Sequence, residues 1–270
     1  MHFICPKCRG KLNILDTRCV CDNGHSYDKA RGGYYNLLLG SGGGVHGDNR
    51  EMILARRAFL SGGFYEPLAK FLAKQVLEHT GESGALLDAG AGEGYYTDII
   101  ERALFLRDGK SDVSAFDISK DAVREICKKN PRISAVVAGS YHIPAPDCEF
   151  DTLINTFSPL ALAETARVLK PGGIFIMAIP GENHLFDLKK VIYDTPYKNT
   201  VEDSALPGFE LLLDEPLTYK IHLGSAEAVN NLFMMTPYAY RTNAVGRARV
   251  ATLERLECTA DFRIFVYRRV

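Results

Sequence analysis

The sequence has no long hydrophobic run and no large excess of charge of either sign. Its longest uninterrupted apolar stretch, residues 174–179, is far shorter than the roughly 20 residues that span a bilayer. The first residues also lack the basic segment followed by an apolar one that marks a secretory signal. Lysine and arginine number 32 and aspartate and glutamate 33, a net charge of −1. We therefore predict no membrane segment, no export, and no positive field over the whole chain of the kind that general nucleic-acid binders carry.

The overall composition is that of an ordinary globular protein. Hydrophobic residues make up 46% and charged residues 24% of the 270 positions, which excludes a disordered, collagen-like or coiled-coil chain. This length exceeds that of one typical domain, so we expect one main core with an appendage.

The cysteines are odd in number and unevenly spread. Of seven, four lie in the first 21 residues, and an odd count without a secretory signal argues against a disulfide framework and for the reducing cytoplasm. Cys5, Cys8, Cys21 and His25 follow the spacing C-x2-C-x12-C-x3-H, which suits tetrahedral Zn²⁺. Cys19 is an alternative ligand, since it would share a strand face with Cys21.

The predicted zinc is structural, because four protein ligands leave no position for a water molecule. A segment of about 35 residues buries too little apolar surface to fold unaided, so metal binding supplies its folding free energy. Residues 1–35 carry six basic and three acidic side chains. Such an excess can contact phosphates, and solvated surface lysines are the equally open alternative.

A glycine-rich stretch, residues 40–47, follows this module and has the composition of a flexible hinge. Asp48 is then a predicted helix N-cap, with Glu51 at the third helical position, and the helix should end at Gly62. A second helix is expected over residues 66–79.

The rest of the chain alternates short apolar runs with amphipathic stretches. This pattern predicts a parallel, doubly wound α/β sheet with helices on both faces. The predicted strands are 85–88, 113–116, 133–138, 152–154 and 174–179, and the helices 95–106, 119–129, 160–169 and 184–192. Late strands at 209–223 and 261–267, around a helix near 226–235, should add an antiparallel hairpin.

The first predicted strand ends in a glycine loop that opens a helix. Asp88 precedes Gly90, Gly92 and Gly94, and Tyr95 begins the helix. Glycine at alternate positions lets the backbone turn sharply and approach a ligand, although this pattern alone is shared by several nucleotide-binding folds. The spacing D-x-G-x-G-x-G resembles class I S-adenosylmethionine (SAM) methyltransferases, and these five residues are the first candidates for cofactor binding.

Later landmarks agree with that resemblance. Asp117 closes the second strand, where a carboxylate can accept hydrogen bonds from both ribose hydroxyls, and Leu169-Lys-Pro-Gly-Gly173 precedes the fifth strand. The class often has an acidic residue beside adenine, four positions before the proline of a Leu-Pro pair. Here Ile143-Pro144 takes the place of that pair, and Gly139-Ser140-Tyr141 before it offers no carboxylate. We therefore expect a backbone group or Ser140 to contact adenine.

The resemblance narrows at the junction of the two modules, where the chain is similar to the bacterial 23S rRNA (guanine-N1)-methyltransferases called RlmA. The shared segments run along nearly the whole chain: the cysteine–histidine ribbon, Tyr34-Tyr35-Asn36-Leu37-Leu38, Glu51-Met52, Ala55 to Leu60, Gly92 to Thr97, Ser158-Pro159, Pro180-Gly181-x-x-His184-Leu185, Leu188-Lys189 and Met235-Thr236-Pro237-Tyr238. The resemblance implies three segments: a zinc-binding RNA-recognition module at 1–39, hinge and linker helices at 40–83, and the methyltransferase domain at 84–270.

The implied reaction is transfer of the SAM methyl to N1 of a guanine in a 23S rRNA hairpin. The family contains two subtypes that modify neighbouring guanines, and one of them affects macrolide sensitivity; the sequence does not choose between them. The implied partners are SAM, structural Zn²⁺ and the rRNA hairpin, without a membrane, and a homodimer is left open.

The target base must be unpaired, since N1 lies on the Watson–Crick edge. Asn155 and Phe157 follow the fourth strand, where the class places its target base. Phe157 would stack on the base, with a packed core aromatic as the equal alternative, and Asn155 would meet the base edge and border the cofactor. Arg56 and Arg57, on the first helix, are candidates for contacts with phosphate or the SAM carboxylate, or for surface ion pairs.

Two other functions remain open from the sequence alone. One is a SAM-dependent methyltransferase of small molecules, of the quinone type, with a structural zinc module. The other is a protein that binds without turnover. RNA binding that weakens steeply with salt would favour the rRNA enzyme over the first of these. The second would be supported by loss of SAM binding on Asp117→Ala together with no methyl incorporation by wild type into any rRNA.

Overall fold

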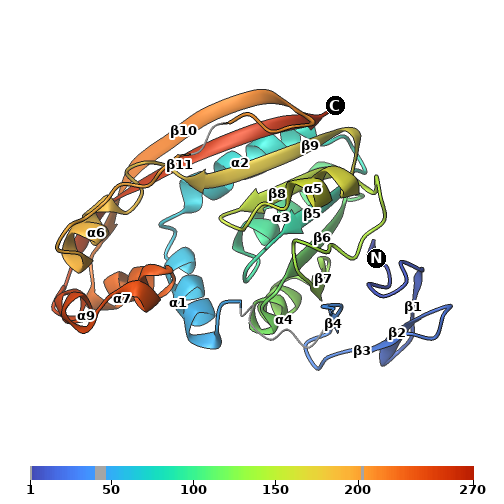
Figure 1. Ribbon diagram of the computed structural model, residues 1–270, viewed down its shortest axis with the longest axis horizontal. Helices are drawn as coiled ribbons and strands as arrows, with labels where there is room; N and C mark the ends of the chain where they lie inside the picture. Colours follow the sequence, from blue (N-terminus) through green and yellow to red (C-terminus); the bar gives the residue numbers. More distant parts are fainter. Residues whose placement is uncertain (1, 40–46, 202–203) are drawn as a thin grey trace.

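The computed structural model describes residues 2–39, 47–201 and 204–270 of the chain. Residues 40–46, most of the predicted hinge, lie outside the described residues. Within them the chain forms a small three-stranded sheet near the N-terminus and a large eight-stranded sheet flanked by helices (Figure 1). The small sheet lies beside one edge of the large one.

The small sheet is an antiparallel meander of short strands. β1 (Leu12–Ile14) pairs with β2 (Arg18–Cys21), which pairs with β3 (Ser26–Asp28). Gly24, with φ of 78°, makes the tight turn between β2 and β3, a conformation that costs glycine little. The turn places His25 four residues after Cys21, so both side chains approach the N-terminal loop.

The large sheet has the strand order of a doubly wound fold extended by a hairpin. Its strands, from one edge to the other, are β10 (Phe209–Leu223), β11 (Leu256–Arg269), β9 (Leu169–Pro180), β8 (Phe150–Thr156), β5 (Ala85–Ala89), β6 (Asp112–Asp117), β7 (Ser134–Val137) and β4 (Tyr35–Asn36). Neighbours from β9 to β4 are parallel, and β11 pairs antiparallel with both β9 and β10. The chain order reverses on the two sides of β5, and ligands bind beyond the strand ends at such a point.

The helices agree with most of the sequence-based predictions. They are α1 (Arg50–Ser61), α2 (Glu66–His79), α3 (Tyr95–Arg107), α4 (Lys120–Lys129), α5 (Leu162–Val168), α6 (Phe186–Ile192), α7 (Ala226–Met234), α8 (Tyr238–Arg241) and α9 (Ala244–Ala251). The prediction of Asp48 as the N-cap of α1 was wrong. Asn49 takes that position and its side-chain oxygen accepts a hydrogen bond from Met52 N–H, because the helix starts one residue later.

The sequence analysis did not predict β4. This two-residue strand adds to the edge of the large sheet, with Tyr35 opposite Val136 of β7. Tyr35 is buried, so the segment that follows the small sheet is anchored in the core beside β7. The chain therefore reaches α1 from the edge of the large sheet.

Further contacts join the small sheet to the large one. Ile4 N–H donates to the Pro144 carbonyl over 2.8 Å, Arg9 pairs with Asp147 at 2.6 Å, and His2 contacts Asp112 at 3.0 Å. These contacts hold the module against the large sheet, while two of the three residues in each of β1 and β3 are exposed.

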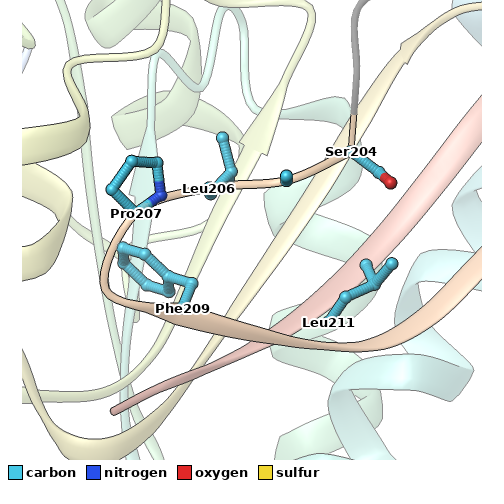
Figure 2. Close-up of a pocket in the computed structure, with 6 residues that line it drawn as sticks. Ser204, Leu206, Pro207, Phe209 and Leu211 are labelled. Atoms are coloured by element: carbon cyan, nitrogen blue, oxygen red, sulfur yellow. The ribbon is translucent and has the colours of Figure 1, made fainter.

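None of the described helices is long and apolar enough to cross a membrane. The hairpin of β10 and β11 forms one long edge of the molecule, with the C-terminus at its end (Figure 1). An apolar pocket of about 510 Å³ lies at the start of β10, lined by residues 204–207, Phe209 and Leu211 (Figure 2). None of the described residues that line it carries a charge.

Candidate active site and metal centre

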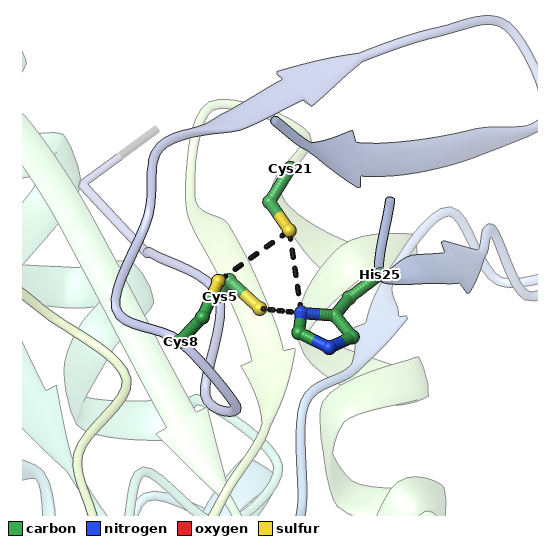
Figure 3. Close-up of side chains that lie close together, drawn as sticks. All are labelled: Cys5, Cys8, Cys21 and His25. Carbon is green, nitrogen blue, oxygen red and sulfur yellow. Dashed lines mark hydrogen bonds between the residues drawn. The ribbon is translucent and has the colours of Figure 1, made fainter. Parts of the chain in front are cut away.

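The predicted zinc ligands meet at one point of the small sheet (Figure 3). The ligand atoms of Cys5, Cys8, Cys21 and His25 all lie within 4.8 Å of one another. Cys8 Sγ is 3.5 Å from Cys21 Sγ, and His25 Nδ1 is 3.4 Å from the sulfurs of both Cys5 and Cys21. The structure leaves Cys19 outside this group; it is buried, and that burial raises the pKa of its thiol to about 11.

This donor set fits Zn²⁺. Tetrahedral zinc with Zn–S bonds near 2.3 Å separates two sulfur ligands by about 3.8 Å, close to the distances in the cluster. Hydrogen bonds, first that from Asn23, lower the pKa of Cys8 to about 6, whereas burial raises the pKa of Cys21. Three thiols this close cannot all ionise without a cation among them. A bound zinc ion would remove that conflict and hold the ends of the module together.

The glycine loop after β5 approaches its neighbours too closely for any side chain. Gly90 has φ of 81°, and a Cβ there would lie 2.1 Å from Ser158 Oγ. Gly94 has φ of 77°, and a Cβ would lie 2.8 Å from Ile126 Cγ1. The N–H groups of Gly90 and Ala91 both donate to the Phe116 carbonyl. The loop is therefore fixed against β6, with its open side toward the strand ends.

Asp88, at the end of β5, is buried and only partly satisfied. One oxygen accepts a hydrogen bond from Thr97 Oγ1 over 2.6 Å, and the other has no partner among the described residues. Burial raises the pKa of this carboxyl to about 7, with a smaller contribution from Asp117 and Glu93. An unpaired buried oxygen costs free energy unless a ligand donor reaches it.

Asp117 lies at the end of β6, on the other side of the loop. It accepts hydrogen bonds from Gly92 N–H (2.9 Å) and Ser119 N–H (2.8 Å). Burial raises the pKa of Asp117, and the Arg56 guanidinium partly offsets this. Arg56 itself pairs with Asp48 and donates to the Met235 carbonyl.

These groups surround one open cavity of about 740 Å³. Its wall comes from α1, the glycine loop, the ends of β6, β8 and β9, and residues 235–238. The volume lies in the range of ligand sites. With the glycine cradle and the unpaired oxygen of Asp88, it fits a nucleoside ligand that carries a cationic amino group, as SAM does. Asp88, Gly90, Gly92, Tyr95 and Asp117 all border it.

Three predicted residues do not reach this wall. Gly94 lies behind it as the N-cap of α3. The Asn155 side chain is buried and lies within 3.5 Å of the Pro159 carbonyl, because Thr156, next along β8, is the residue that faces the cavity. Ser140 follows β7 and is also outside the lining.

Phe157 does reach the cavity, in a strained conformation. Its φ of 59° is unusual for an aromatic residue, and its side chain is 40% exposed. The ring is roughly parallel to that of His184, with centroids 6.3 Å apart, and its centroid is 5.6 Å from that of Phe262. A planar ring held at an open mouth can stack on a base.

The sequence analysis assigned no role to the remaining aromatic wall. Tyr65, Tyr96, His184 and Tyr238 all line the cavity. Tyr96, His184 and Tyr238 belong to segments noted for their family resemblance, and that resemblance was the only sequence signal for them. Of the two arginines on α1, Arg56 lines the cavity, whereas Arg57 forms an exposed ion pair with Glu125.

Comparison with known proteins matches each module to a family. The family model described as "RlmA, N-terminal" covers residues 3–39, and a "Methyltransferase domain" model covers residues 86–173. The chain is 33% identical to a protein of Micromonospora griseorubida whose name places it among the 23S rRNA (guanine-N(1)-)-methyltransferases, over 100% of this chain and 98% of that one.

Other relatives are more distant. The 23S rRNA (guanine(748)-N(1))-methyltransferase of Streptomyces fradiae is 29% identical over 92% of this chain and 89% of its own. Among solved structures, the YcgJ protein of Bacillus subtilis is 13% identical with a TM-score of 0.49, over 74% of this chain and 97% of that one.

Proposed function

Because this chain belongs to the RlmA family of 23S rRNA (guanine-N1)-methyltransferases, we propose that it transfers the SAM methyl group to N1 of a guanine in a 23S rRNA hairpin. The observation that carries this proposal is full-length similarity to a relative of that name, since it joins the ribbon and the methyltransferase sheet in one protein. The open cavity beside the glycine loop, at the ends of β6, β8 and β9, is large enough to hold the reactants.

In this proposal the chain's own residues hold and orient the two reactants. The loop of Gly90, Gly92 and Gly94 cradles the cofactor, Asp117 accepts from its ribose hydroxyls, and Asp88 receives its amino group. Tyr95 closes the wall over it. When bound, the cofactor supplies an already activated methyl group, so positioning is the main task of the protein.

The base would enter from the mouth, beside Phe157. Its exposed ring supports stacking on an unpaired guanine. Asn155 acts through its buried contact with the Pro159 carbonyl, which holds the turn that carries Phe157 and Ser158. Contact of Ser140 or the neighbouring backbone with adenine stays a prediction, because Ser140 lies outside the lining of the cavity.

The division of labour follows the predicted segments. Residues 1–39, held by zinc at Cys5, Cys8, Cys21 and His25, would contact rRNA, residues 40–83 would connect, and residues 84–270 would carry out transfer. An rRNA substrate places this work in the cytoplasm. A homodimer stays a prediction, which sedimentation of the purified protein would test.

Primer extension on 23S rRNA tests this function. A methyl group at N1 blocks base pairing, so reverse transcriptase stops there. We expect one stop to vanish from rRNA of a deletion strain and to return with the wild-type gene. The Gly90→Val gene serves as the control and should not restore it. Identical stops in all strains would contradict the proposal.

A further inference from the structure

The cavity has two chemically different sides. Asp88, Glu93 and Asp117 lie toward β5 and β6, around the glycine loop. On the opposite side, at the ends of β8 and β9, the wall is aromatic and carries Phe157, His184 and others. Because the cofactor occupies the glycine-loop side, the aromatic side is where the acceptor base must lie.

His184 forms two hydrogen bonds that together fix its protonation. Its Nδ1 accepts from the backbone N–H of Asp261 over 3.3 Å, so Nδ1 carries no proton. Burial lowers the pKa of His184 to about 4, and the neutral ring therefore carries its proton on Nε2. Nε2 is 3.3 Å from the Tyr65 hydroxyl, to which it must donate.

A tight turn holds His184 in that orientation. A Cβ at Gly181 would lie 2.6 Å from the Asp261 carboxylate, so only glycine lets the loop come this near to β11. Gly181 N–H donates to the Asp261 carbonyl, and the Asp261 carboxylate accepts from Asn183 N–H and the Thr218 hydroxyl. The Pro-Gly-x-x-His pattern of the sequence is explained by this clamp.

The hydrogen bond from His184 leaves the Tyr65 hydroxyl free to act as a donor. Its oxygen accepts from His184, and no other described residue hydrogen-bonds to its hydroxyl, so its own proton is left to donate. Burial raises the pKa of Tyr65 well above its ordinary value, which keeps the hydroxyl protonated. The side chain is 2% exposed and lines the cavity, packed edge-on against Phe59 and Phe262.

We propose that the Tyr65 hydroxyl donates a hydrogen bond to O6 of the target guanine and that His184 positions it for this contact. This inference rests on the proposed function. N1 forms a bond to the methyl carbon, the carbon–sulfur pair returns to sulfur to leave a thioether, and the N1 proton passes to water. Negative charge that develops on O6 as the proton leaves is stabilised by the Tyr65 donor.

The same donor selects against adenine. Adenine carries an amino group where guanine carries O6, so two donors would face each other and the tyrosine would lose its acceptor. Tyr65 therefore contributes to rate and to base choice through one hydrogen bond.

The test compares two tyrosines that differ in access to the cavity. Tyr65→Phe removes the donor, and Tyr219→Phe is the matched control. The Tyr219 hydroxyl already donates to the Phe64 carbonyl, its ring packs against Phe262, and it is not among the described residues that line the cavity. In single-turnover methylation of a 23S rRNA hairpin, we expect Tyr65→Phe to slow transfer by about 100-fold, with SAM affinity unchanged. Tyr219→Phe should stay within about threefold of wild type.

Two further readouts separate this role from a structural one. His184→Phe should slow transfer and His184→Gln should restore most of it, since the glutamine amide can both accept from Asp261 and donate to Tyr65. With adenine in place of the target guanine, Tyr65→Phe should narrow the guanine-to-adenine rate ratio by about tenfold or more.

Each remaining outcome contradicts the inference. If wild type methylates guanine and Tyr65→Phe does so at the same rate, the role of Tyr65 is contradicted but the proposed function stands. Equal losses of rate in Tyr65→Phe and Tyr219→Phe, or a loss of SAM affinity in Tyr65→Phe, would contradict the role of Tyr65 in the same way. No transfer by wild type to any 23S rRNA hairpin overturns the proposed function, and this inference with it.

Discussion

The small sheet and the large sheet are held together by different physical means. β1, β2 and β3 contain three or four residues each, and only Leu12, Cys19 and Cys21 among them are buried. By contrast every residue of β5 is buried, within a core that runs through both faces of the large sheet. The metal cluster compensates for the small core of the first region, whereas the second is stabilised by apolar burial.

In the proposed function this difference separates RNA recognition, by the small sheet, from methyl transfer, by the large one. A region held by metal ligands can keep its outer faces polar and available to a partner, while the cofactor loop needs rigid strands beneath it. The contacts at Ile4, Arg9 and β4 hold the first region in a fixed place beside the second. If the two regions are stabilised independently, a substitution in one should leave the other folded.

Loss of a zinc ligand should have the largest effect and should break only the small sheet. We expect Cys8→Ser, or chelation of wild type, to unfold residues 2–30, because structural zinc contributes about 10 kcal/mol or more in isolated fingers. SAM affinity should change by less than about twofold, since distant sites are additive.

Limited proteolysis checks the first result and calorimetry the second. Cys148→Ser is the control, because Cys148 is exposed and far from the cluster in sequence. Equal protease resistance of Cys8→Ser and wild type would contradict the zinc account.

Gly90→Val should break the large region instead. The new side chain would collide with Ser158 and sit at φ of 81°, so we expect a cost of about 3 kcal/mol and a loss of SAM affinity of about 100-fold. Gly172→Ala is the control for backbone strain without a steric collision. Gly172 also has a positive φ, 75°, but nothing lies within 4 Å of the position that its Cβ would take. Calorimetric titration that gave Gly90→Val normal affinity would refute the cradle.

Binding of SAM should release a proton from Asp88, because the pKa of this carboxyl is raised in the free protein. The cation should lower the pKa of Asp88 from about 7, so binding at pH 7 should release up to about half a proton. Titrations in two buffers of different ionisation enthalpy measure this release. Asp88→Asn should abolish it, and equal release by both proteins would remove Asp88 from the account.

Without the ligand the same group makes stability depend on pH. The folded pKa, about 7, exceeds the unfolded value of 3.8, so the folded state binds the proton more tightly. Stability should therefore fall as pH rises from about 4 through about 7. Asp88→Asn should flatten that slope in denaturant titrations, and an unchanged slope would contradict the assignment.

The contact between the regions should give the smallest effect. The Asp112 hydrogen bond raises the pKa of His2 above 6.5, so its contribution is present below that pH and lost as pH rises through the folded value. Hydrogen-exchange protection factors around His2 in zinc-saturated protein, each corrected for the intrinsic exchange rate at its pH, should be higher near pH 5.5 than near pH 8. His2→Asn should lose this dependence on pH. If the variant keeps it, a group other than His2 is responsible.

Local patterns in the sequence predicted the parts of the site built from adjacent residues. The C-x2-C-x12-C-x3-H spacing predicted the metal cluster, and the glycine loop with Asp88 and Asp117 predicted one side of the cavity. Each depends on a single turn or on neighbouring strand ends, which the sequence encodes directly.

The rest depends on how distant segments pack. Tyr65 and His184 are far apart in the chain, and both contact β11, Tyr65 at Phe262 and His184 at Asp261. Asn155 was predicted to face the cavity, but its neighbour Thr156 does so. Successive residues of a strand point to opposite faces, so a shift of one position moves a side chain to the other face. The two-residue strand β4 carries too short a pattern to be predicted.

The most direct test of the account is methyl transfer by the zinc-ligand variant. Wild type and Cys8→Ser would be given labelled SAM and a 23S rRNA hairpin, and both SAM binding and label in N1-methylguanosine would be measured. We predict equal SAM binding by the two proteins and label in the RNA with wild type only. Equal labelling by both proteins would contradict the claim that the zinc module presents the base to the methyltransferase sheet.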